Sequence, residues 1–167
     1  MPSQAKQRKV LLAGASGLVG GHILQALLSD PTVSEVHALS RRALPLSHEK
    51  LQVHVVDFNK LPRLPQADEA FLALGTTIKV AGSQAAFRAV DLEANLLVAK
   101  AASASGVRRI GLVSAVGANA KSSVFYNRVK GELEDALSVM SLTALVIAQP
   151  SLLLDYRDGL QQPPRLG

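Results

Sequence analysis

KVLLAGASGLVGG, residues 9–21, joins a short apolar run to a loop with a glycine at every third position. Lys9–Ala13 is typical of a buried strand, and Gly17–Ser29 has the apolar spacing of a helix that ends at Asp30 and Pro31. A strand that passes through a glycine-rich turn into a helix is the first half of a βαβ unit. The stretch therefore predicts an α/β fold.

The rest of the chain alternates apolar runs of strand length with longer segments of helical period. Further strands are predicted at Val36–Leu39, Leu51–Val56, Ala70–Leu74, Arg109–Val113 and Leu142–Ala148. Further helices are predicted at Ser83–Ser103 and Val124–Met140, the first with its core side formed by Phe87, Val90, Ala94, Leu97 and Ala101. This alternation predicts a Rossmann-type doubly wound parallel sheet of strand order 3-2-1-4-5-6 with helices on both faces.

Length and composition bound the chain to one domain, because 167 residues that are 48% hydrophobic can bury one substantial core. Residues 1–7 are expected to be a flexible tail. Residues 150–167 are expected to be the irregular start of a truncated carboxyl-terminal part, which leaves the portion that caps a substrate pocket short or missing.

The net charge and the lack of cysteine narrow the classes of partner and the cellular compartment that we expect for the protein. The net charge of +5 is scattered and lacks interleaved aromatic residues, so we expect no nucleic-acid partner. There is no cysteine for a disulfide or a thiolate metal site, no metal site is expected, and no apolar stretch is long enough to cross a membrane. These features, with no secretory signal core after the basic amino terminus, predict a cytoplasmic protein.

The glycine loop fits a dinucleotide because each glycine has a separate reason to lack a side chain. Gly14 allows a tight turn, Gly17 lets a pyrophosphate approach the backbone, and Gly20 lets the helix pack closely on the strand. The amides at the start of the helix would bind the phosphates, with further contacts expected from Ser16, Leu18 and Val19.

The residues after the second strand bear on which dinucleotide is bound. An NAD site usually has an acidic residue there for the ribose hydroxyls, whereas this chain has Ser40, Arg41 and Arg42. Two guanidinium groups can bind a 2′-phosphate through charge-assisted hydrogen bonds, so NADP(H) is preferred and NAD(H) is left open. The alternative is a solvated basic turn without a ligand.

Other cofactor contacts are expected where the third, fourth and sixth strands end. Asp57 could accept a hydrogen bond from the adenine amino group, although an acidic residue is also common at the start of a turn. The remaining residues of this kind are Phe58, Leu74, Gly75, Thr76, Thr77 and Pro150.

A candidate reaction site follows the fifth strand. Ser114 ends that strand, and Tyr126 and Lys130 lie four residues apart on the next helix, hence on one face. A tyrosine donates a proton to a carbonyl near neutral pH only when nearby positive charge stabilises its phenolate, and a lysine ammonium can supply that charge. Lys130 would also bind the nicotinamide ribose, and Ser114 would hold the substrate oxygen. The alternative for the Tyr126 and Lys130 pair alone is an ordinary helix surface.

In five motifs the chain resembles the atypical short-chain dehydrogenase/reductase superfamily, and within it the branch of the human Tat-interacting oxidoreductase and its bacterial relatives. The motifs are LAGASGLVG (residues 12–20), LGTTIK (74–79), FRAVD (87–91), VSAVGA (113–118) and YNRVKGELE (126–134). The resemblance implies a Rossmann fold that binds NADP(H), with Ser114, Tyr126 and Lys130 as the catalytic residues.

The chain departs from the pattern of this family in three respects. Asp91 stands where ordinary members have an asparagine. Gln149 precedes Pro150 where the family has arginine, and Asp155 stands at about the place of a later glycine. Related chains also continue for roughly fifty further residues that close the substrate pocket.

Three functional hypotheses follow. The first is an NADP(H)-dependent oxidoreductase that acts on a small carbonyl or alcohol substrate, with Tyr126 as acid and base. The alternative is a non-catalytic NADP(H)-sensing module, and a sugar-nucleotide epimerase or dehydratase ranks last. A homodimer through the two long helices is one option, because their apolar stripes would serve either an interface or the sheet.

Overall fold

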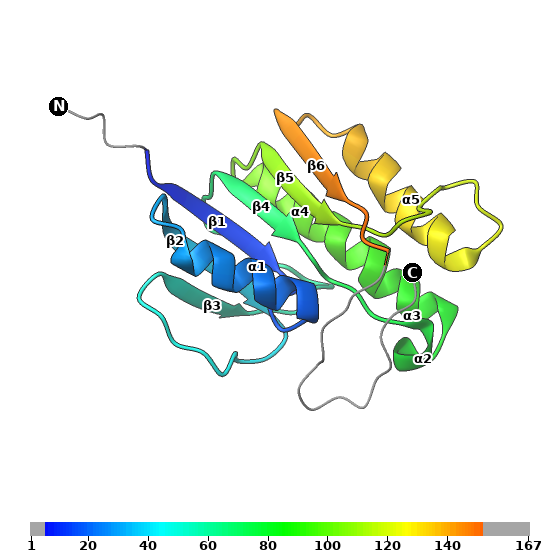
Figure 1. The fold of residues 1–167 in the computed structure, drawn as a ribbon, viewed down its shortest axis with the longest axis horizontal. Coiled ribbons are helices and arrows are strands. Elements are labelled where there is room, and N and C mark those ends of the chain that lie inside the picture. The colour runs from blue at the N-terminus through cyan, green and yellow to red at the C-terminus, as the bar shows by residue number, and fades with distance from the viewer. Residues whose placement is uncertain (1–5, 152–167) are drawn as a thin grey trace.

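The computed structural model describes residues 6–151, and within them six parallel strands form one sheet (Figure 1). The strand order is β3-β2-β1-β4-β5-β6, which confirms the predicted order. The strands are β1 (Arg8–Ala13), β2 (Val33–Ser40), β3 (Leu51–Val55), β4 (Glu69–Leu72), β5 (Arg109–Val113) and β6 (Ala144–Ala148).

The strand ends differ from the predicted ones by a few residues. β2 begins three residues earlier than expected, at Val33, and β4 stops at Leu72, so that Leu74 lies beyond the strand. The Ala73 amide still donates a hydrogen bond of 2.8 Å to the Ala13 carbonyl oxygen. The chain then leaves the ladder, and Leu74 belongs to the loop at the carboxyl edge of the sheet.

Helices lie on both faces of the sheet, as predicted (Figure 1). Helix α1 (Leu18–Ser29) covers one face with Leu24, Leu27 and Leu28 buried. The opposite face is covered by α4 (Asn95–Ala104) and α5 (Phe125–Ser138). The short helices α2 (Ile78–Ala81) and α3 (Gln84–Arg88) lead into α4.

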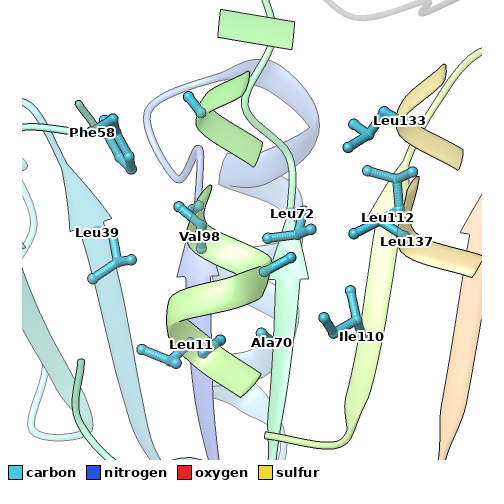
Figure 2. Packing of buried hydrophobic residues seen from close by; sticks show 14 of the residues in the cluster. Leu11, Leu39, Phe58, Ala70, Leu72, Val98, Ile110, Leu112, Leu133 and Leu137 are labelled. Atoms are coloured by element: carbon cyan, nitrogen blue, oxygen red, sulfur yellow. The ribbon is translucent and has the colours of Figure 1, made fainter. Parts of the chain in front are cut away.

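The larger core lies between the sheet and the helices α4 and α5. Figure 2 shows Leu11, Leu72 and Leu112 on neighbouring strands, with Val98 of α4 and Leu137 of α5 packed over them. All five side chains are almost completely buried. Fully burying a leucine or valine side chain generally stabilises a fold by about 1.5–3 kcal/mol, so this face contributes much of the hydrophobic stabilisation.

The predicted long helix is interrupted in its middle by a π-helical segment, η1 (Ala89–Ala94). A π-helical turn takes more residues than an α-helical turn, so the heptad pattern counted from Phe87 loses its register beyond it. Leu97, expected in the core, is 43% exposed, and Val98 is buried instead. The predicted core side was therefore wrong at Leu97, whereas Ala101 packs against the larger core as predicted.

The connection between β3 and β4 contains no helix. Phe58 and Leu64 of this connection are buried in the larger core and fill the place where a crossover helix would pack. The Ser105 hydroxyl donates a hydrogen bond of 2.9 Å to the Leu64 carbonyl oxygen. A loop with buried anchors thus closes this part of the sheet.

Helix α1 covers only part of its face. Along β6, Leu145 and Ile147 point to the larger core, whereas Val146 on the α1 side is 69% exposed. Within residues 6–151, no helix lies over this side of β6 (Figure 1). The sheet is therefore covered unevenly.

His37, a buried histidine of β2, contacts His54 of β3. The His37 Nε2 atom is 3.1 Å from a Glu35 carboxylate oxygen, and its Nδ1 atom is 3.0 Å from Nε2 of His54. A neutral His37 that donates from Nε2 to Glu35 accepts from His54 at Nδ1. Burial, and then the neighbouring His54, hold the pKa of His37 below its usual value of 6.5.

We expect the stability of the fold to decrease as the pH falls below about 6.5, because the unfolded chain then binds a proton that folded His37 resists. Above that pH, His37 is neutral in the folded and the unfolded chain, and the free energy of unfolding loses nothing through it. The free energy of unfolding in urea, measured at about pH 7.5 and about pH 5.5, tests this. His37→Gln should reduce the loss, whereas His48→Gln, in the connection after β2, should retain it. Equal stability of the unaltered protein at both pH values would contradict the expectation.

Candidate active site

A crevice opens at the carboxyl edge of the sheet, where the loops after β1, β4, β5 and β6 meet. Parallel strands bring their carboxyl ends to one edge, and ligands of such sheets bind there. The crevice is lined by Gly17, Leu18, Val19, Ala73, Leu74, Gly75, Val113, Ser114, Ala115, Tyr126, Lys130, Pro150 and Ser151. Sequence reasoning named most of these residues but missed Ala73, Val113, Ala115 and Ser151. Their position next to strand ends is the signal that could have identified them.

The glycine loop packs too closely for side chains at two positions. Gly14 has a φ of +99°, and a Cβ atom there would lie 2.3 Å from the Ala73 carbonyl oxygen. A Cβ atom at Gly20 would lie 1.9 Å from the Gly14 carbonyl oxygen. At Gly17 the nearest atom to such a Cβ would be 3.4 Å away, and this residue lines the crevice. Gly14 and Gly20 thus shape the loop, and Gly17 leaves room in the crevice.

The structure brings Ser114, Tyr126 and Lys130 together in this crevice. Ser114 follows β5 and is held by a hydrogen bond of 2.7 Å from its amide to the Ala148 carbonyl oxygen. Its buried hydroxyl has no hydrogen-bond partner among the described residues. Tyr126 and Lys130 are one turn apart on α5, with the Lys130 ammonium 5.6 Å from the centre of the Tyr126 ring. A polar group added to the crevice could therefore bond to Ser114.

Lys130 forms a buried ion pair with Asp91 of η1. The Lys130 ammonium donates a hydrogen bond of 2.5 Å to Oδ1 of Asp91, and the Thr76 amide donates one of 2.9 Å to Oδ2. The Asp91 side chain is completely buried and that of Lys130 is 6% exposed. Removing one partner of such a pair generally costs about 3–5 kcal/mol. Thr76, expected to contact the cofactor, thus contributes its amide to this pair.

Asn95 is a further buried polar residue beside the pair of Asp91 and Lys130, and sequence reasoning missed it. Its side-chain amide donates hydrogen bonds of 2.9 Å to the Leu74 carbonyl oxygen and 3.1 Å to the Asp91 carbonyl oxygen. Its own Oδ1 atom is buried without a partner among residues 6–151. A polar residue four positions after Asp91 on an otherwise apolar side of the helix is the signal that could have indicated it.

The basic turn after β2 is open to solvent. Arg41 and Arg42 are exposed, and neither forms an ion pair with a carboxylate of the described part of the chain. Ser40 before them is buried, and its hydroxyl oxygen accepts a hydrogen bond of 3.3 Å from the Arg42 amide. Both guanidinium groups therefore remain available to an anionic ligand.

Three other residues predicted to contact a cofactor make local contacts. The Asp57 carboxylate accepts a hydrogen bond of 2.9 Å from the Asn59 amide, as in a turn. The Thr77 hydroxyl oxygen accepts one of 3.1 Å from the Val80 amide and caps α2. Phe58 is buried in the core. None of the three lines the crevice.

The residues of the crevice fit a dinucleotide. Gly17 presents backbone without a side chain at the start of α1, where free amides favour a phosphate. The free Ser114 hydroxyl and Lys130 lie across the same crevice and could bind polar groups of the ligand. Among residues 6–151, no three histidine, aspartate or glutamate side chains are placed to hold a metal ion.

Comparison with known proteins identifies the family. Residues 14–153 match the sequence pattern of the NAD(P)H-binding family. The chain belongs to this family. It is also 37% identical over 158 residues to "Protein FMP52, mitochondrial" of Candida glabrata, and 35% identical over 151 residues to "Protein FMP52-1, mitochondrial" of Scheffersomyces stipitis. These alignments cover 92% and 87% of this chain, and 67% of each relative.

Solved structures with a similar fold include members of the short-chain dehydrogenase and epimerase superfamily. MoeE5 in complex with UDP-glucose and NAD superposes with a TM-score of 0.69 at 18% identity. ADP-L-glycero-D-manno-heptose-6-epimerase of Helicobacter pylori gives 0.68, also at 18% identity. The alignments cover 84% and 89% of this chain but 53% and 56% of those structures. This NAD(P)-binding Rossmann-like chain therefore spans about half of their length, and the likeness concerns the fold.

The expected cytoplasmic location was wrong, because the relatives are named as mitochondrial proteins. The absence of cysteine had suggested a reducing compartment but does not distinguish one such compartment from another. In the part of the chain that the structure describes, no helix combines the length and apolar character needed to cross a membrane. The predicted features of residues 1–5 and 152–167, including Asp155, lie outside the described residues.

We expect Gly20→Ala to destabilise the fold by about 1–3 kcal/mol, because the new methyl group would overlap the Gly14 carbonyl. Gly21→Ala is the matched control, since its Cβ would have ordinary contact at 3.6 Å and alanine favours a helix. Urea unfolding followed by circular dichroism measures both variants. A Gly20→Ala protein as stable as the Gly21→Ala protein would show that the loop does not require this close approach.

Proposed function

We propose that the chain is an NADP(H)-dependent oxidoreductase of the short-chain dehydrogenase type that acts on a small carbonyl or alcohol substrate. The observation that carries the proposal is the free, buried Ser114 hydroxyl in one crevice with Tyr126, Lys130 and the glycine loop. The resemblance to the branch of the Tat-interacting oxidoreductase supports the same reading. The similarity to epimerase structures concerns the fold and does not extend to their substrates.

In the reduction, Ser114 would bind the substrate carbonyl oxygen through its hydroxyl, which has no other partner among the described residues. Tyr126 would donate the proton to that oxygen as it gains negative charge. Lys130 would orient the cofactor ribose with ammonium hydrogens that Asp91 does not take, since an ammonium has three. A bound nicotinamide cofactor would supply the hydride for this reduction.

The preference for NADP(H) rests on the basic turn. The exposed Arg41 and Arg42 follow directly after β2, the strand next to β1 whose loop begins the crevice. Neither arginine is paired with a described carboxylate, so a 2′-phosphate would not have to displace one. Guanidinium groups bind phosphate in a bidentate manner, which favours the phosphorylated cofactor.

Tyr126→Phe should reduce NADPH oxidation by on the order of a hundredfold or more, because it removes the proton donor, while NADPH affinity changes little. Turnover is measured with a panel of aldehydes, ketones and quinones, and affinity by NADPH fluorescence. The control is Tyr156→Phe, which changes the other tyrosine of the chain. Unchanged turnover in Tyr126→Phe would exclude Tyr126 as the acid. Tight NADPH binding without turnover in the unaltered protein would favour the sensing module.

The double variant Arg41→Ala/Arg42→Ala should lose at least tenfold more affinity for NADPH than for NADH, since only NADPH has the 2′-phosphate. The control is Lys100→Ala/Lys121→Ala, which removes two exposed cations far along the chain from this turn. Both affinities are measured by titration at fixed salt. An equal loss for the two cofactors would indicate general electrostatic attraction instead of recognition of the phosphate.

A further inference from the structure

Two hydrogen-bond donors from different parts of the chain converge on the buried carboxylate of Asp91. One is the Lys130 ammonium of α5, at 2.5 Å from Oδ1, and the other is the Thr76 amide in the loop after β4, at 2.9 Å from Oδ2. Each oxygen thus has its own donor. Asp91 thereby connects the loop after β4, which contains Thr76, to Lys130, which lines the crevice.

The arrangement requires a carboxylate. A side-chain amide of the same size has one oxygen acceptor and one NH₂ donor, so it could satisfy either Lys130 or Thr76 but would oppose the other with a donor. A buried donor without an acceptor is costly, and a buried unpaired ammonium is more so. The negative charge of Asp91 is therefore matched to the positive charge of Lys130.

We propose that Asp91 is a positioning residue that fixes Lys130 beside Tyr126 and compensates its charge, so that the phenol faces a neutral pair instead of a free cation. This inference rests on the proposed role of Tyr126. Because the two opposite charges are only 2.5 Å apart, their electrostatic effects on the more distant Tyr126 ring largely cancel. Lys130 then stabilises a Tyr126 phenolate less than an unpaired ammonium would, and two of its hydrogens remain for a ligand.

The other charged groups on the elements around Tyr126 are engaged elsewhere or exposed. Arg88 of α3 forms an ion pair with Glu132 of α5, with 2.6 Å between the charged atoms. Arg128 of α5 donates to the Ser122 carbonyl oxygen and lies over the Phe125 ring, and Glu93 of η1 is exposed. The pair of Asp91 and Lys130 is thus the buried charge that borders the Tyr126 ring.

The ionisation of Tyr126 can be measured directly, without cofactor or substrate. The chain has two tyrosines and no tryptophan, so in a Tyr156→Phe background the rise of tyrosinate absorbance with pH reports Tyr126 alone. Tyr126→Phe in that background should remove the rise and serves as the control. The titration is carried out on the background protein, on Asp91→Asn, on Lys130→Met and on the double variant.

Charge compensation predicts a different result for each single variant. Lys130→Met should move the absorbance rise to higher pH, because an unbalanced carboxylate remains beside the phenol. Asp91→Asn removes that negative charge and should leave the rise at the same or a lower pH, since a buried ammonium without its partner either keeps its charge or releases its proton. The double variant should titrate close to the background protein. A Lys130→Met midpoint at or below that of the background protein, or an Asp91→Asn midpoint above it, would overturn the proposal.

If a single variant does not fold, the folding of the double variant tests charge compensation instead. Circular dichroism is recorded for every variant at the pH range of the titration. If Asp91→Asn does not fold, the double variant should recover folded protein, because it removes both charges. A double variant as unfolded as the single one would contradict charge compensation. Since no turnover is measured, failure of this inference is distinguishable from failure of the proposed oxidoreductase activity.

Discussion

The close approach of α1 to the end of β1 sets the geometry on which the crevice depends. The Gly20 backbone lies against the Gly14 carbonyl, and Gly14 in turn lies against Ala73 after β4. Any side chain at either glycine would push the helix or the neighbouring strand outward. The contact therefore fixes the first turn of α1 beside the loop after β4, where the free amides of the helix can meet a phosphate.

The sheet and the position of the crevice could be predicted from the sequence because both follow from local patterns. Apolar runs separated by helical segments give parallel strands, and the carboxyl ends of parallel strands share one edge. Ser114, Tyr126 and Lys130 were assigned to one site on that basis, and the structure places all three in the crevice. Their roles in a reaction remain a proposal.

The details that the sequence did not predict depend on packing between distant segments. Asp91 and Lys130 are 39 residues apart, and no periodicity in either helix requires that their side chains meet. The interruption of the long helix was missed because pattern analysis assumes a constant number of residues per turn. Asn95 was missed for a different reason, because its hydrogen bond to the Leu74 carbonyl oxygen depends on how the helix packs beside the loop after β4.

The charges of the site fall into two groups with different surroundings. Outside the crevice lining, Arg41 and Arg42 are exposed and unpaired within the described chain, so their attraction for an anion will weaken with salt. At the inner end, the pair of Asp91 and Lys130 is buried and screened little by ions. A ligand that reached from the crevice to the basic turn would therefore have one salt-sensitive and one salt-insensitive contact.

The π-helical segment η1 makes the position of the Asp91 side chain depend on the number of residues in the helix. Asp91 lies within this segment, so the direction of its carboxylate depends on how many residues the helix contains between Phe87 and Asn95. Side-chain replacements at exposed positions such as Glu93 leave that number unchanged. Loss of a single residue would rotate one part of the helix against the other by about 100°. The site thus depends on the length of this helix as well as on its composition, and an insertion or deletion here would disturb it even with Asp91 and Lys130 unchanged.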